Sequence, residues 1–158
     1  MTRIAALISL ALLCAVQPAA AQTSETIFRS YKKAAAYEDV KFELNNAIID
    51  KGLALDHTGA IGRMLDRTGA DVGSDKAIYK NAEYLSFCSA RFSRRMMEAD
   101  PANIAFCPFI IFIYEEAAQP GTTIVGYRRP PVIGNEASQK ALAEIDALLD
   151  SIAREATQ

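Results

Sequence analysis

A run of six apolar residues, from Phe109 to Tyr114, constrains the fold of this chain more than any other feature. Its sequence, FIIFIY, is built from β-branched and aromatic residues, which favour a strand. A strand with one solvated face alternates apolar and polar residues, and this run does not alternate. We therefore expect a central strand covered on both faces, or a strand that lies at an interface between two subunits.

The first 21 residues have the pattern of a secretory signal peptide. Arg3 provides a positive start, residues 4–16 are almost entirely apolar, and Ala19 to Ala21 place small residues at a cleavage site. The apolar run is short for a membrane span. We expect cleavage after Ala21, export to a bacterial periplasm, and no membrane span in the mature chain.

The mature chain, residues 22–158, is expected to form a single α+β domain. Besides the central strand, the apolar periodicity predicts strands at 26–35, 53–56, 84–88 and 123–127, and helices at 37–51, 58–66, 90–99 and 137–153. Seventeen basic and nineteen acidic residues give a net charge of -2. This balance argues against a nucleic-acid partner, because phosphate binding needs a clustered excess of Lys and Arg.

Five short motifs occur in an order that is typical of one protein family. They are YEDV at 37–40, KG at 51–52, MMEADP at 96–101, PFIIFIYE at 108–115 and VGYR at 125–128. This order resembles the domain of unknown function 302 family, over a core of about residues 27–130. The resemblance implies a β-α-β(4)-α-like antiparallel sheet with helical insertions and commonly a homodimer. A C-terminal amphipathic helix is expected at about 136–155. The family name records no activity.

The topology implied by this resemblance would bring two cysteines together. The strand ending at Cys88 and the strand beginning near Phe109 would be antiparallel neighbours, so Cys88 and Cys107 would meet at one end of the sheet. The strand ending at Tyr127 would bring Arg128 and Arg129 there as candidate anion contacts. The third cysteine, Cys14, lies in the signal segment.

Three interpretations of Cys88 and Cys107 stay open. An exported pair favours a structural disulfide. Thiolates and thioethers also select Cu(I), and Met96 or Met97 would assist such a metal site. Thiol redox chemistry is the third, since a helix that begins after Ser89 and nearby arginines would lower a thiol pKa. Zinc is disfavoured, because the chain has one histidine and no C-x-x-C pair.

No motif of the sequence identifies a reaction. The single histidine, His57, is expected at the sheet end opposite Cys88, and no catalytic triad or phosphate-binding loop can be assigned. We therefore expect a non-enzymatic periplasmic binding or accessory module of unknown ligand. It would be homodimeric and stapled by a Cys88–Cys107 disulfide. The alternative is a periplasmic protein that handles Cu(I) or performs thiol redox chemistry with the same two cysteines.

Overall fold

The computed structural model of the chain describes residues 27–158, and the predicted signal peptide lies outside these residues. Two 3-10 helices occur at Ala70–Val72 and Pro101–Phe106. The other elements, in chain order, are β1 (Phe28–Lys33), α1 (Tyr37–Asp50), β2 (Ala54–Gly59), α2 (Ile61–Thr68), β3 (Tyr79–Cys88), α3 (Ala90–Ala99), β4 (Phe109–Glu116), β5 (Thr123–Arg128) and α4 (Glu136–Glu155). The predicted β-α-β(4)-α-like order with helical insertions is confirmed.

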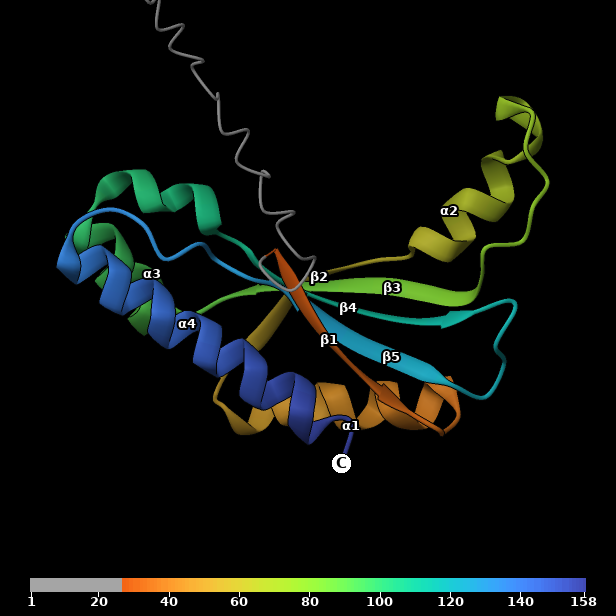
Figure 1. Cartoon of the computed structure of the whole chain (residues 1–158), viewed down its shortest axis with the longest axis horizontal. Coiled ribbons are helices and arrows are strands. Elements are labelled where there is room, and N and C mark those ends of the chain that lie inside the picture. The colour runs from red at the N-terminus through yellow and green to blue at the C-terminus, as the bar shows by residue number, and fades with distance from the viewer. Residues whose placement is uncertain (1–26) are drawn as a thin grey trace, which may run out of the picture.

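The five strands form one antiparallel sheet in the order β1-β5-β4-β3-β2. The apolar strand β4 is central, as predicted. Its burial alternates along the strand, however, with Ile111 and Ile113 fully buried and Phe112 and Tyr114 half-buried. The expectation that helices cover both faces of β4 is wrong for the described chain. Helices α1 and α4 lie on one face, and α2 stands over only the β3 side of the other (Figure 1).

The hydrophobic core lies between the sheet and helices α1 and α4. Val40, Leu44 and Ile48 recur every four residues along α1 and are fully buried, and α4 contributes a similar stripe. Burying each such side chain contributes about 1.5–3 kcal/mol. Helix α1 ends before Gly52, whose φ of 71° is the left-handed conformation that a glycine adopts most easily. Among residues 27–158, no helix has the length and apolarity needed to cross a membrane.

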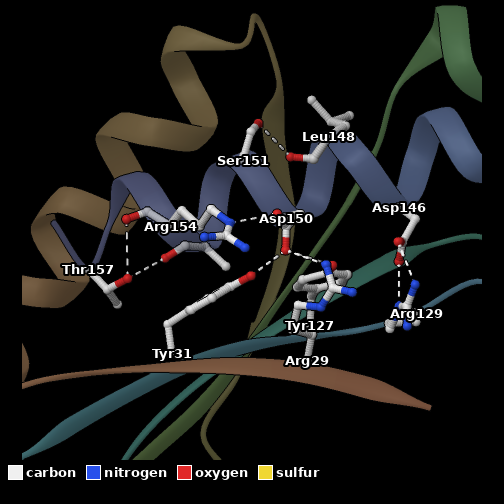
Figure 2. A network of polar contacts seen from close by, with 11 residues as sticks. Arg29, Tyr31, Tyr127, Arg129, Asp146, Leu148, Asp150, Ser151, Arg154 and Thr157 are labelled. Atoms are coloured by element: carbon white, nitrogen blue, oxygen red, sulfur yellow. Dashed lines mark hydrogen bonds and ion pairs between the residues drawn. The ribbon is translucent and has the colours of Figure 1, made fainter. Parts of the chain in front are cut away.

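Polar contacts dock α4 onto the sheet (Figure 2). Asp150 Oδ1 accepts hydrogen bonds from Tyr31 Oη at 2.5 Å and Tyr127 Oη at 3.1 Å. The same oxygen lies 3.0 Å from Arg29 Nη1, and Oδ2 accepts from Arg154 Nε at 2.7 Å. Partial burial alone would raise the pKa of Asp150. The hydrogen bonds from two tyrosines and two arginines outweigh it and hold the pKa well below the usual range.

The largest differences from the predicted boundaries concern β3, β2 and α2. Strand β3 begins at Tyr79, five residues before the expected start, because its polar first half pairs with β4. There Lys80 Nζ and Asn81 Nδ2 each lie 3.1 Å from an oxygen of the buried Glu115 carboxylate. Strand β2 runs on to Gly59 through pairing with β3, so α2 begins at Ile61 rather than near residue 58. Both partners are distant in sequence, which is why the local pattern does not reveal them.

Candidate functional site

The antiparallel pairing of β3 and β4 brings Cys88 and Cys107 to one end of the sheet. Phe87 is opposite Phe109 in the register, so Cys88 ends one strand just where Cys107 precedes the next. The two Sγ atoms are 3.7 Å apart. The predicted proximity is therefore present, but both residues are free thiols. At this separation the expected disulfide is not shown, since a disulfide needs sulfurs about 2.05 Å apart, and it stays a prediction.

The surroundings of the thiols make Cys88 a weak acid. Partial burial raises the pKa of Cys88 to about 11, assisted by its hydrogen bond to Cys107 and by the Asp56 carboxylate. The expectation of a lowered thiol pKa is wrong here. At the start of α3, the Ser89 side chain caps the helix by accepting a hydrogen bond from the Phe92 N–H. This N–H is therefore bound to Ser89 and not to a cysteine sulfur. Cys107 Sγ has a further neighbour in Ser93 Oγ at 3.3 Å.

The two methionines between the cysteines belong to the hydrophobic core. Met96 is fully buried within it, and Met97 packs against it half-buried. Residues 27–158 hold no group of three or more His, Cys, Asp and Glu side chains that could bind a metal ion. The two cysteine sulfurs are thus the donors at this end of the sheet that could bind a metal ion.

Arg128, the last residue of β5, and Arg129, which follows it, lie near Cys107 and differ in their contacts. With Cys107 they line a pocket of about 130 Å³. Arg129 donates to both oxygens of Asp146, at 2.9 and 2.8 Å, in a bidentate ion pair with α4 (Figure 2). Arg128 is exposed, and no hydrogen bond or ion pair joins it to another side chain of residues 27–158. Arg128 is therefore the arginine available to an external anion.

The histidine does not lie at the sheet end opposite Cys88. His57 is opposite Ser86 in the β2–β3 register, and Ala54, at the start of β2, is opposite Cys88. The prediction failed because β2 extends three residues beyond its expected end. The His57 ring lies beside the Tyr84 ring, with 5.9 Å between centroids, on the open side of the sheet. The structure thus gives His57 an aromatic neighbour on the open face.

The open face of the sheet carries a row of aromatic rings. Phe28 on β1 meets Phe112 on β4 edge to face, with centroids 6.0 Å apart. Phe112 continues to Tyr114 at 6.1 Å, and Tyr114 meets Tyr79 on β3 at 5.4 Å. The row crosses from the β1 edge to β3 on the side away from α1 and α4. It is an aromatic surface that no helix of residues 27–158 covers completely.

Two glycines make room for the rings of this face. A Cβ atom on Gly126 would lie 2.4 Å from Cζ of Phe112, so the ring lies directly over the glycine. A Cβ atom on Gly59 would lie 2.0 Å from Cε1 of Tyr84. A glycine in a strand marks a place where another group approaches the backbone closely. Gly126 and Gly59 thus let the Phe112 and Tyr84 rings pack directly against the strand backbone, so these rings protrude less from the open face of the sheet.

The open face is hollowed into an apolar groove of about 430 Å³. Ile61 of α2 stands at one wall and Phe28 at the other, with Phe112 and Tyr114 on the floor and Arg128 at one end. The hollow extends past Tyr79 towards Lys76 and, at its other end, towards Pro108. A groove of this volume with an apolar lining and few polar groups is typical of a binding site for a small molecule.

The groove was not predicted from the sequence. Its signal was present in β4, where Ile110, Phe112 and Tyr114 occupy alternate positions and must share one face. A glycine in the neighbouring strand β5, Gly126, was a second signal. Neither shows by itself that the face stays free of helices, because that depends on where α1 and α4 pack.

Fold and site together define a small α+β protein with one sheet face under helices and the other open. The family model described as domain of unknown function DUF302 matches residues 29–156, and this chain belongs to that family. The match extends beyond the core expected from the sequence and includes α4. The fold is similar to the crystal structure of an uncharacterized conserved DUF302 protein from Bacillus stearothermophilus. The TM-score is 0.68 at 16% identity, over 82% of this chain and 98% of that one. None of the curated proteins matches the chain.

Proposed function

We propose that this chain is an exported, non-enzymatic binding module that takes an elongated apolar molecule with an anionic end group into the groove on its open sheet face. The observation that carries the proposal is the groove itself, which is aromatic along its floor and has the exposed Arg128 at one end. Apolar binding sites fix a ligand's orientation with a small number of placed polar groups. In this groove, Arg128 is the polar group that would orient the ligand.

The length of the groove favours an extended ligand. The open-face positions of β4 run from Ile110 to Glu116, which is about 20 Å at roughly 3.4 Å per residue. The hollow follows this line at both ends. A chain-like apolar molecule would cover the rings along the groove. Removing apolar surface from water contributes about 25 cal/mol per Å², so a ligand that covers the whole row binds better than a short one.

The charges around the groove favour an anionic end group at Arg128. Glu83 lines the groove, but its carboxylate is held by Lys41 at 2.6 Å. Glu116 lies at the far end of the hollow, beyond Tyr114, with Lys76 also nearby. An anionic group is therefore attracted to the Arg128 end, since at the other end the charges of Glu116 and Lys76 offset each other. This polarity fixes the direction in which the ligand lies.

Export and self-association complete the proposal. The signal-like first 21 residues support a periplasmic location, and the family resemblance supports a homodimer. In the periplasm, such a module would hold an amphiphile out of water. Its activity would be binding and release, without chemical change of the ligand.

A fluorescent long-chain polyene fatty acid tests the proposal. Protein expressed from the full sequence should bind one fatty acid per chain and should bind the matched alcohol more weakly. Arg128→Gln should weaken fatty acid binding about fivefold, because a partly exposed ion pair contributes about 1 kcal/mol, and should leave alcohol binding unchanged. Arg94→Gln, which alters an arginine with 78% exposure on α3, is the matched control and should change neither.

Phe112→Ala separates the groove from non-specific adsorption. Truncating the ring at the centre of the floor should weaken binding of both the acid and the alcohol. Absence of saturable binding, or unchanged binding by the Phe112→Ala protein, would overturn the proposal. Binding that weakens as the protein concentration rises would show a second copy of the chain in the groove, and this result would also overturn it.

A further inference from the structure

The thiol pair at the end of the sheet is separate from the groove floor. Cys88 and Cys107 come from segments 19 positions apart in the sequence, and the β3–β4 register holds their sulfurs at 3.7 Å. Cys88 is exposed, and Cys107 is half-buried beside a pocket of about 130 Å³. Two soft donors therefore stand together at a place that solvent reaches. From this geometry we propose that Cys88 and Cys107 form a binding site for one soft monovalent metal ion, Cu(I).

The number and type of donors decide which metal the site fits. Structural zinc takes four nitrogen or sulfur ligands, and catalytic zinc takes three. Within residues 27–158, no group of three His, Cys, Asp and Glu side chains is available. His57 lies against Tyr84, and Met96 is buried in the core. Two thiolates without a hard third ligand match Cu(I), which thiolate and thioether ligands select.

The sulfur spacing leaves a coordination position open. A metal ion about 2.3 Å from each sulfur, the length of a zinc–thiolate bond, would make an S–metal–S angle of roughly 110° at the observed spacing. Such a bent pair leaves one side of the ion free for a third soft ligand from solution. The exposed position of Cys88 places that side within reach of solvent. The site thus fits an ion that is received and passed on, rather than one that is enclosed.

Binding exchanges protons for the metal and transfers no electron. Each thiol releases its proton to solvent as its sulfur–copper bond forms, so two thiols and one Cu(I) give one dithiolate complex and two protons. Thiols are mostly protonated at neutral pH, so the proton competes with the metal ion for each sulfur. Each proton released changes the apparent affinity about tenfold per pH unit. Copper affinity should therefore fall steeply as the pH is lowered.

The test titrates Cu(I) into the reduced protein without oxygen, against a chromogenic copper chelator. Protein expressed from the full sequence should take up one Cu(I) per chain, and Zn²⁺ should not displace it. Cys88→Ser and Cys107→Ser should each lose the stoichiometric copper. Ser93→Ala keeps both sulfurs while removing the hydroxyl 3.3 Å from Cys107, so it is the matched control and should retain the copper. A circular dichroism spectrum checks that each variant is folded.

Several results would overturn the proposal. One is a reduced protein that leaves the copper with the chelator. Another is copper retained by either cysteine variant. A Cys88–Cys107 disulfide that mild reductant cannot open, shown by intact mass before and after alkylation, would establish a structural staple instead. Fatty acid binding in the groove is measured separately, so neither proposal fails with the other.

Discussion

Replacing Asp150 by alanine should destabilise the protein strongly, because it removes the centre of the polar contacts at the α4–sheet interface. The carboxylate is 19% exposed and accepts hydrogen bonds from Tyr31 and Tyr127 on two strands. A hydrogen bond to a charged group contributes about 1.5–3 kcal/mol, and Tyr127 is fully buried, so its hydroxyl would lose its partner without gaining water. The ion pair with Arg29, which is 35% exposed, adds about 0–1 kcal/mol, and the pair with the more exposed Arg154 adds less than that. We expect a loss of about 3–5 kcal/mol in the free energy of unfolding.

Urea unfolding at pH 7 measures this loss, with Arg154→Ala as the control that should lower the free energy of unfolding far less. The pH dependence gives a second readout. Because the pKa of Asp150 is lowered in the folded state, its stabilisation is present above the ordinary carboxyl pKa of 3.8 and declines as the pH falls below it. The gap between wild type and Asp150→Ala should narrow under acid. Equal losses for Asp150→Ala and Arg154→Ala, or a gap that stays constant with pH, would refute the reasoning.

Three further predictions follow from the fold and the sequence. Gly126→Ala would place a Cβ atom 2.4 Å from the Phe112 ring and 2.7 Å from the Arg29 carbonyl oxygen; we expect a loss of about 1–3 kcal/mol by urea unfolding together with weaker fatty acid binding. Unchanged binding would show that the ring need not lie over the glycine. Intact mass of the exported protein should correspond to a chain that begins at Gln22, and retention of the first 21 residues would contradict the signal peptide. Analytical ultracentrifugation should give the mass of two chains, and a mass of one chain would contradict the predicted homodimer.

The elements that the sequence predicts well are those whose signals are local. Helix α3 begins after the Ser89 cap and ends before Asp100, and α4 shows its apolar stripe directly. The first half of β3 gave no such signal, because Lys80 and Asn81 are polar and become part of a strand only through Glu115. The same reason explains β2, which continues through residues 57–59 because β3 lies beside it.

The features of the candidate site also differ in whether their signals are local in the sequence. The proximity of Cys88 and Cys107 followed from the topology that the family resemblance implied, but the thiol pKa did not, since it depends on burial and on the direction of a hydrogen bond. The Asp150 network was also missed. Its sequence signal is Asp146, Asp150 and Arg154 at spacings of four on α4, which places them on one side of a helix. Which strand residues face that side depends on the packing of the whole sheet.

The most direct test of the groove uses two neighbouring isoleucines of β4 that point to opposite faces. Ile110 lines the hollow of the open face, whereas Ile111 is fully buried in the core. Methyl NMR spectra recorded while a long-chain fatty acid is added should show a large, saturable shift for Ile110 and for Ile61 of α2. The methyl signals of Ile111 and of Ile145 on α4 should not shift. Equal shifts for Ile110 and Ile111, or no shift for Ile110 at saturating fatty acid, would contradict a ligand in the groove.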